Sequence, residues 1–100
     1  MDKYKVKMLP HAFRDVEGIY EYIATEKLSP QNAKGQTDRI KRAIKSLATM
    51  PESHQERFEG RYAGKGYRQL VVDNYIVIFR INEIEKIVFV VTVQYQGRNI

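Results

Sequence analysis

Three apolar runs between residues 67 and 93 constrain the fold of this chain more than any other feature. The runs are rich in β-branched and aromatic residues, and two short polar breaks, Asp73-Asn74 and residues 82–86, separate them. Short breaks between runs of this composition are typical of hairpin turns. The segment therefore predicts an antiparallel meander of three strands. It carries two arginines, Arg68 and Arg80, which suggests a surface that binds something anionic.

A further strand is expected at the start of the chain. Tyr4, Val6 and Met8 alternate with lysines, which is the pattern of a strand with one buried and one wet face. The lysines suit an edge strand, because charge there discourages unwanted pairing with other chains.

Two helices are expected between this strand and the meander. Pro10 and Pro30 each stand where a helix can begin, and apolar residues at helical spacing follow both. The first helix should reach about Glu26, and the second should stop before Pro51, because the residue before a proline resists the helical conformation. The expected buried stripes are Phe13, Val16, Ile19, Tyr20 and Ile23 on the first helix, and Ala33, Thr37, Ile40, Ile44 and Leu47 on the second.

The expected element order is β-α-α-β-β-β, which is an α+β fold. The short connection between the helices makes them an antiparallel hairpin, and this hairpin should pack on an antiparallel sheet. A length of 100 residues predicts a single domain spanning residues 1–100. Both faces of the three C-terminal strands are largely apolar, whereas the helices can cover only one face. A partner, the polar loop at residues 51–66 or the C-terminal tail must therefore cover the other face.

The composition limits the function classes. The net charge of +5, from 17 Lys and Arg against 12 Asp and Glu, favours anionic partners through long-range attraction. No cysteine is present, which excludes disulfides and thiolate metal sites. His11 and His54 have no third ligand at useful spacing, so neither a metal nor another cofactor is expected. Apolar runs far shorter than ~20 residues and a polar N-terminus predict a cytoplasmic protein without a membrane span.

The chain resembles the RelE/ParE superfamily of toxins from bacterial type II toxin–antitoxin modules. The resemblance extends over nearly all of the sequence and rests on the order and spacing of five segments: DVEGIYEYI at 15–23, RIKRAIKSL at 39–47, GKGYRQLVVDNY at 64–75, FRI at 79–81 and YQGRN at 95–99. It implies the compact α+β fold of the superfamily. It also implies a toxin that a cognate antitoxin holds inactive by wrapping an acidic segment around it. The basic charge and the surplus apolar face would serve such a partner.

The superfamily divides by target. RelE-like members cut mRNA on the ribosome, whereas ParE-like members poison DNA gyrase and are not nucleases. The segments at 67–72 and 95–99 look closer to ParE. The resemblance therefore implies growth inhibition through DNA gyrase, with a RelE-like, ribosome-dependent mRNA endonuclease as the alternative. The implied partners are a cognate antitoxin and either gyrase or the ribosome with its mRNA, and neither a membrane nor a small-molecule cofactor is expected.

Only the nuclease alternative requires catalytic residues. Metal-free RNA cleavage needs a base, cations that stabilise the charged phosphorane and an acid that protonates the leaving oxygen. Arg68 and Arg80 are the candidate cations, and Tyr95 is the candidate acid. Glu59 is the candidate base. The residues expected to bind the target, whether protein or nucleic acid, are Arg61, Lys65, Arg68, Arg80 and Arg98.

Structural roles compete with these functional ones. Arg68 could instead pair with Glu83 or Glu85 across a hairpin, and Tyr95 could cap the sheet by packing. The loop cations could be solvated charges without a partner. A third hypothesis is a protein that only binds its antitoxin. Against cleavage stands the composition of the tail, where cations would help but the residues are Gln94, Gln96 and Gly97.

Overall fold

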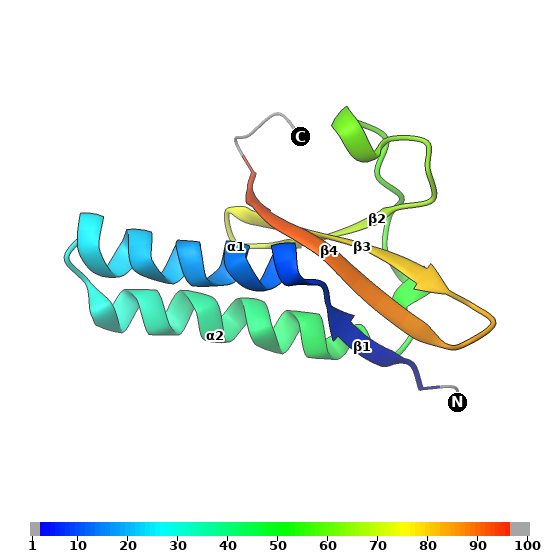
Figure 1. Cartoon of the computed structure of the whole chain (residues 1–100), viewed down its shortest axis with the longest axis horizontal. Helices are drawn as coiled ribbons and strands as arrows, with labels where there is room; N and C mark the ends of the chain where they lie inside the picture. Colours follow the sequence, from blue (N-terminus) through cyan, green and yellow to red (C-terminus); the bar gives the residue numbers. More distant parts are fainter. Residues whose placement is uncertain (1–2, 97–100) are drawn as a thin grey trace.

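The computed structural model describes residues 3–96, which form a helical hairpin packed against one face of a four-stranded sheet (Figure 1). The elements are β1 Lys5–Met8, α1 Pro10–Glu21, α2 Pro30–Ser46, β2 Arg68–Val72, β3 Tyr75–Asn82 and β4 Ile87–Tyr95. The predicted order and the α+β class are confirmed. In Figure 1 the α1–α2 turn and the β3–β4 turn lie at opposite ends of the molecule. Neither helix in this part of the chain is long and apolar enough to cross a membrane.

The sheet has the strand order β1-β4-β3-β2, and its three C-terminal strands form the predicted antiparallel meander. The prediction of an antiparallel sheet is wrong for β1, which pairs in parallel with β4 and places Val6 opposite Val88. The sheet is therefore mixed. Alternating polar and apolar residues reveal which face of a strand is buried, but they carry no information on the direction of its neighbour. The edge position of β1 is confirmed.

The first helix ends where expected, and its predicted stripe is confirmed in part, because Val16 is buried and Ile19 packs against the core. A π-helical turn, Tyr22–Glu26, continues α1 to the predicted end. Ala12 and Val16 are buried, whereas Phe13 is 57% and Tyr20 40% exposed, which corrects their expected place in the core. Because Ala12 faces the sheet, the helix is rotated so that its neighbour Phe13 points away from the core.

The core lies between the helices and the sheet. All five residues predicted for the buried stripe of α2 are buried, with Ile40 and Leu47 fully inaccessible. From the sheet, Val77 and Phe79 enter the same cluster. The ring of His54, on the loop after α2, meets the ring of Phe79 edge to face, with the ring centres 5.9 Å apart. This loop residue therefore closes one end of the core.

The loop at residues 51–66 covers part of the face that the helices leave open. Ile76 and Ile78 point to that face, yet their exposed fractions are only 4% and 0%. Gln69, the register partner of Ile78, accepts a hydrogen bond from Arg57 Nη1 at 2.8 Å. Arg57 is itself 8% exposed, a structural role that nothing in its local sequence indicated. We expected a partner, the loop at residues 51–66 or the C-terminal tail to cover this face. The loop is confirmed as the cover next to Gln69 and Ile78.

The turn between β2 and β3 is tied to α2 through Asp73. Its Oδ2 accepts a hydrogen bond from Arg39 Nε at 2.8 Å and another from Gln36 Nε2 at 2.9 Å. These bonds lower the pKa of Asp73 below its ordinary value of 3.8, and the bond from Arg39 has the larger effect. The carboxylate therefore fastens the meander to the helical layer while it is ionised.

We expect Asp73→Asn to remove a pH-dependent part of the stability. Because the pKa is lowered in the folded state, the ionised carboxylate stabilises the fold fully above pH 3.8 and loses that effect as the pH falls through the lowered pKa. Asparagine tolerates the φ of 55° at this position, so the turn itself should survive. Urea denaturation from neutral to strongly acidic pH should show a stability difference between the two proteins that shrinks on acidification. A constant difference would contradict this role.

Candidate functional site

The two arginines of the meander point to opposite faces of the sheet. Arg68 lies opposite Phe79 in the β2–β3 register and so shares the helix-covered face with that core residue. Arg80 follows Phe79 and faces the other way, where its guanidinium carbon lies 4.4 Å from the ring centre of Phe89. The structure therefore does not bring the two candidate cations together.

Arg68 is held by the loop rather than by an acidic residue. Its Nη1 donates a hydrogen bond to the backbone oxygen of His54 at 2.7 Å. The alternative ion pair with Glu83 or Glu85 does not form among residues 3–96, where Glu83 accepts a hydrogen bond from the Tyr4 hydroxyl at 2.9 Å and Glu85 accepts one from Asn82. Arg68 thus anchors the loop at the end of the core that His54 closes.

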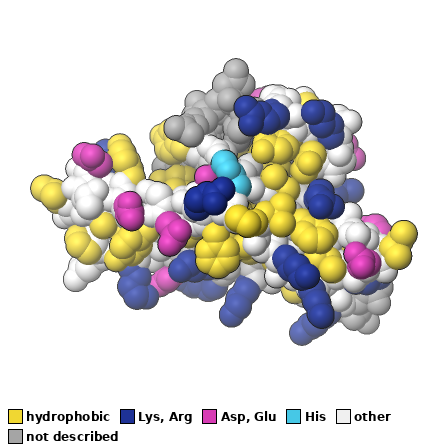
Figure 2. Space-filling view, in the orientation of Figure 1, with side chains coloured by type: hydrophobic (Ala, Val, Ile, Leu, Met, Phe, Trp, Pro, Cys, Tyr) yellow, Lys and Arg dark blue, Asp and Glu magenta, His cyan; other side chains and the backbone are white. Residues whose placement is uncertain are grey.

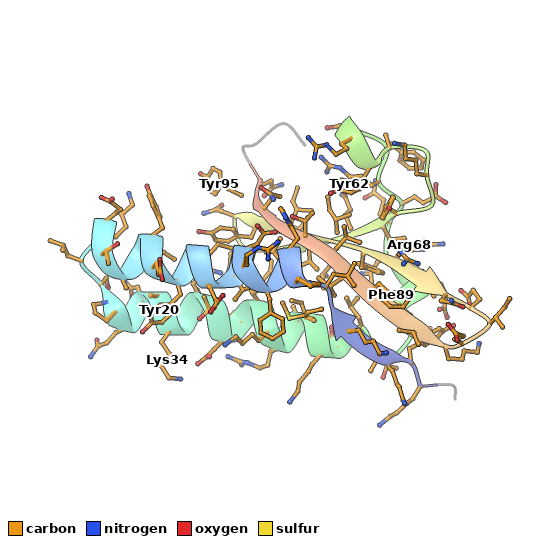
Figure 3. All side chains as sticks on the ribbon, viewed as in Figure 1. Tyr20, Lys34, Tyr62, Arg68, Phe89 and Tyr95 are labelled. Atoms are coloured by element: carbon orange, nitrogen blue, oxygen red, sulfur yellow. The ribbon has the colours of Figure 1, made fainter. Side chains whose placement is uncertain are left out.

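Tyr95 lies at the other end of the sheet from Arg68 (Figure 3). Its side chain is 54% exposed, and its ring meets Tyr75 edge-on with the ring centres 5.8 Å apart. The pKa of Tyr75 is raised mainly by burial and to a smaller extent by the neighbouring Tyr95. This hydroxyl therefore stays protonated at neutral pH. Tyr75 and Phe79, the register partners of Tyr95 and Arg68, are four residues apart on β3, which is ~13 Å along a strand. Arg68, Arg80 and Tyr95 therefore do not surround one phosphate in this arrangement.

The other predicted site residues lie on the loop or in the tail. Arg61 belongs to a short 3-10 turn, Gly60–Tyr62, and both Arg61 and Lys65 are exposed. Glu59, the candidate base, is exposed beside them. Arg98 lies outside the described residues. Within residues 3–96 no group of three or more His, Cys, Asp or Glu side chains is placed to hold a metal ion.

A hollow that the sequence patterns did not reveal lies between α1 and α2. Its volume is about 470 Å³, and the exposed rings of Phe13 and Tyr20 form part of its wall. Helical spacing of apolar residues does not distinguish a helix side that meets the core from one that meets a partner. The full lining is Met8, Phe13, Val16, Glu17, Tyr20, Glu21, Thr37 and Lys41.

A second hollow, of about 500 Å³, adjoins the first and shares Met8 and Lys41 with it. It lies between β1 and α2. Asp38 on its wall is already paired with Lys34 Nζ at 2.7 Å, and this hydrogen bond lowers the pKa of Asp38. The wall is therefore dominated by the cations of α2, which are Lys41, Arg42 and Lys45. We call the two hollows together the hairpin groove.

The outer edge of β1 borders the hairpin groove. The backbone N–H groups of Lys5 and Leu9 bond to the β4 side of the sheet. Val6 and Met8, which alternate with them, therefore turn their N–H and C=O groups outward, and beyond the bridge between Lys3 and Thr49 no described strand pairs with that edge. An open strand edge, an apolar hollow and cations in one place are what an extended or helical acidic segment needs for docking.

Comparison with known proteins identifies a related family. One family model matches residues 6–100, and this family is described as the ParE toxin of the type II toxin–antitoxin system parDE. No curated protein matches the chain in sequence.

Solved structures of toxin–antitoxin systems share the fold. A chain of the chromosomal ParDE system from P. aeruginosa is similar with a TM-score of 0.75 and 19% identity, over 93% of this chain and 96% of that one. The RelBE2 complex from Mycobacterium tuberculosis gives a TM-score of 0.63 and 17% identity, over 98% and 97%. The archaeal RelE–RelB complex from Pyrococcus horikoshii gives 0.63 and 17%, over 96% and 98%. At these identities the structural similarity shows the fold alone.

Proposed function

This chain belongs to the ParE toxin family of type II toxin–antitoxin systems, and from that premise we propose that it stops bacterial growth by acting on DNA gyrase. The family match over residues 6–100 is the observation that carries the proposal. Inhibition of this kind requires a surface that binds a protein and does not require a catalytic centre.

The positions of the candidate catalytic residues support a mode of action without cleavage. Metal-free cleavage of RNA needs its base, cations and acid within reach of one phosphate. Arg68 and Arg80 lie on opposite faces of the sheet, and the ring of Tyr95 packs against Tyr75 at the far end. Arg68 is moreover committed to the backbone oxygen of His54. These contacts favour structural roles for Arg68 and Tyr95.

Induction of the chain in bacteria, with two measurements on one culture, tests the proposal. Plasmid supercoiling together with markers of DNA breaks reports on gyrase, and a transcriptome-wide map of mRNA 5′ ends reports on cleavage. We expect relaxed or broken DNA and intact messages when growth stops. Growth arrest with unchanged supercoiling, together with no effect of the purified chain on gyrase in vitro, would contradict the proposal.

The cations on the outer face favour one alternative, a RelE-like, ribosome-dependent mRNA endonuclease. Arg61 and Lys65 are exposed on the loop that covers this face, and Arg80 is exposed on the same face of β3. Codon-phased cuts in mRNA with normal DNA, in the experiment described above, would support this alternative. Loss of those cuts in Tyr95→Phe would then assign Tyr95 as the acid.

We further propose that the cognate antitoxin docks in the hairpin groove. The similar structures include toxin–antitoxin complexes, which supports an antitoxin partner for this toxin. Phe13 and Tyr20 offer exposed aromatic anchors, and the outer edge of β1 offers backbone groups to an added strand. The cations of α2 would meet the carboxylates of an acidic segment.

A further inference from the structure

The sheet face away from the helices carries a basic patch around an aromatic ring. Arg80, Phe89 and Lys7 are register partners across β3, β4 and β1, and Lys5 lies in the next row opposite Ile87. Neighbouring strands are ~4.8 Å apart, and alternate residues of one strand, such as Lys5 and Lys7, are ~6.6 Å apart. We call these five residues the Phe89 platform.

Among residues 3–96, the cations of the Phe89 platform have no acidic ion-pair partner. In Figure 2, dark-blue side chains border hydrophobic ones in the region where Figure 3 labels Phe89. None of the ion pairs within residues 3–96 involves Lys5, Lys7 or Arg80. Of the two carboxylates of the adjoining β3–β4 turn, Glu83 is paired with Lys86 Nζ at 3.9 Å, and Glu85 accepts a hydrogen bond from Asn82 at the end of β3. Within the described part of the chain, positive charge without an ion-pair partner therefore remains on this face of the sheet.

Protection of a sheet edge does not explain the whole patch. Lysines on the edge strand β1 discourage pairing with other chains. Arg80, however, lies on β3, an interior strand of the sheet, where a charge protects no edge. Its guanidinium lies over the half-buried ring of Phe89, which holds the cation at the surface.

We propose that the Phe89 platform binds single-stranded nucleic acid. The phosphates would lie along Lys5 and Lys7, and a base would stack on the guanidinium plane of Arg80, which Phe89 supports from below. The inference does not depend on which of the two proposed targets is correct, because it rests on the geometry of the platform alone.

An acidic peptide fits this surface less well than a nucleic acid does. Over Ile87–Val90, where the platform lies, the backbone groups of β4 are used for pairing within the sheet, on one side with β3 and on the other with β1. An extended peptide laid across the face would leave its own N–H and C=O groups without protein partners. A nucleic acid binds through phosphate charge and the flat faces of its bases, and the platform supplies a match to both.

Fluorescence anisotropy with 5′-fluorescein oligonucleotides tests the proposal. The full chain is titrated into one sequence prepared as single-stranded RNA, single-stranded DNA and duplex DNA, at several salt concentrations. We expect tighter binding of single strands than of the duplex, and the two single-stranded probes show which sugar is preferred. Lys7→Glu should weaken binding about tenfold or more and lower the slope of log affinity against log salt by about 1.

Two further variants keep the result decisive. Lys27→Glu makes the same change of charge in the segment that joins α1 to α2, at the far end of the molecule (Figure 1), and should change affinity by about twofold or less, because distant charges are screened. Phe89→Leu keeps an apolar side chain under Arg80 but removes the aromatic ring. If this variant has an unchanged circular dichroism spectrum and binds more weakly, the ring itself contributes to binding. Equal losses in Lys7→Glu and Lys27→Glu, or preference for the duplex, would overturn the proposal.

Discussion

Truncation of Phe79 to alanine should lower the free energy of unfolding by about 3–5 kcal/mol. Phe79 is fully buried on β3, an interior strand, in the cluster that joins the sheet to both helices. His54 covers one edge of its ring. Loss of the ring removes its apolar burial and leaves a cavity, and strands β2 and β4 hold β3 on both sides so that the cavity cannot easily close.

Urea denaturation measures this loss. Domains of this size have a total stability of about 5–15 kcal/mol, so the variant should be only marginally folded. Ile84→Ala is the matched control, because Ile84 is 95% exposed on the β3–β4 turn, and it should change the free energy of unfolding by less than about 0.5 kcal/mol. Equal effects of the two substitutions would mean that Phe79 does not lie in the core.

The register that seats Phe79 in the core could have been predicted from the sequence. A two-residue turn at Asp73-Asn74 fixes the pairing of β2 with β3 and thereby places Arg68 opposite Phe79. Arg80, the next residue, must then face away from Arg68. The length of this turn therefore predicts that the two arginines lie on opposite faces of the sheet, although their positive charge had suggested a common site.

Features that depend on contacts between distant segments could not be predicted in this way. The meander and the stripe of α2 have strong local periodicity, and both are confirmed. The parallel pairing of β1 and the outward position of Phe13 depend on how the helices return the chain to the sheet. Arg57 resembles the other loop cations in its local sequence, yet it alone among them bonds to Gln69 and is buried within the part of the chain that the structure describes.

Replacement of Phe13 by aspartate should weaken binding of the antitoxin by at least about 30-fold, because loss of an aromatic anchor at an interface often costs about 2 kcal/mol or more. Phe13 is exposed in the free toxin and lines the hairpin groove beside Tyr20. The new carboxylate would also repel an acidic segment. Since the ring contributes little to the core, the variant should remain folded.

Titration calorimetry with the antitoxin encoded beside the toxin measures the affinity. Ile84→Asp makes a comparable change on an exposed residue outside the groove and is the matched control. Lys45→Glu, at the basic end of the groove, should weaken binding in a manner that depends on salt. Unchanged affinity in both groove variants would place the antitoxin on another surface. In cells, Phe13→Asp toxin should stop growth even when the antitoxin is present. Because growth arrest requires an active toxin, that outcome would also separate the surface for the antitoxin from the surface for the target.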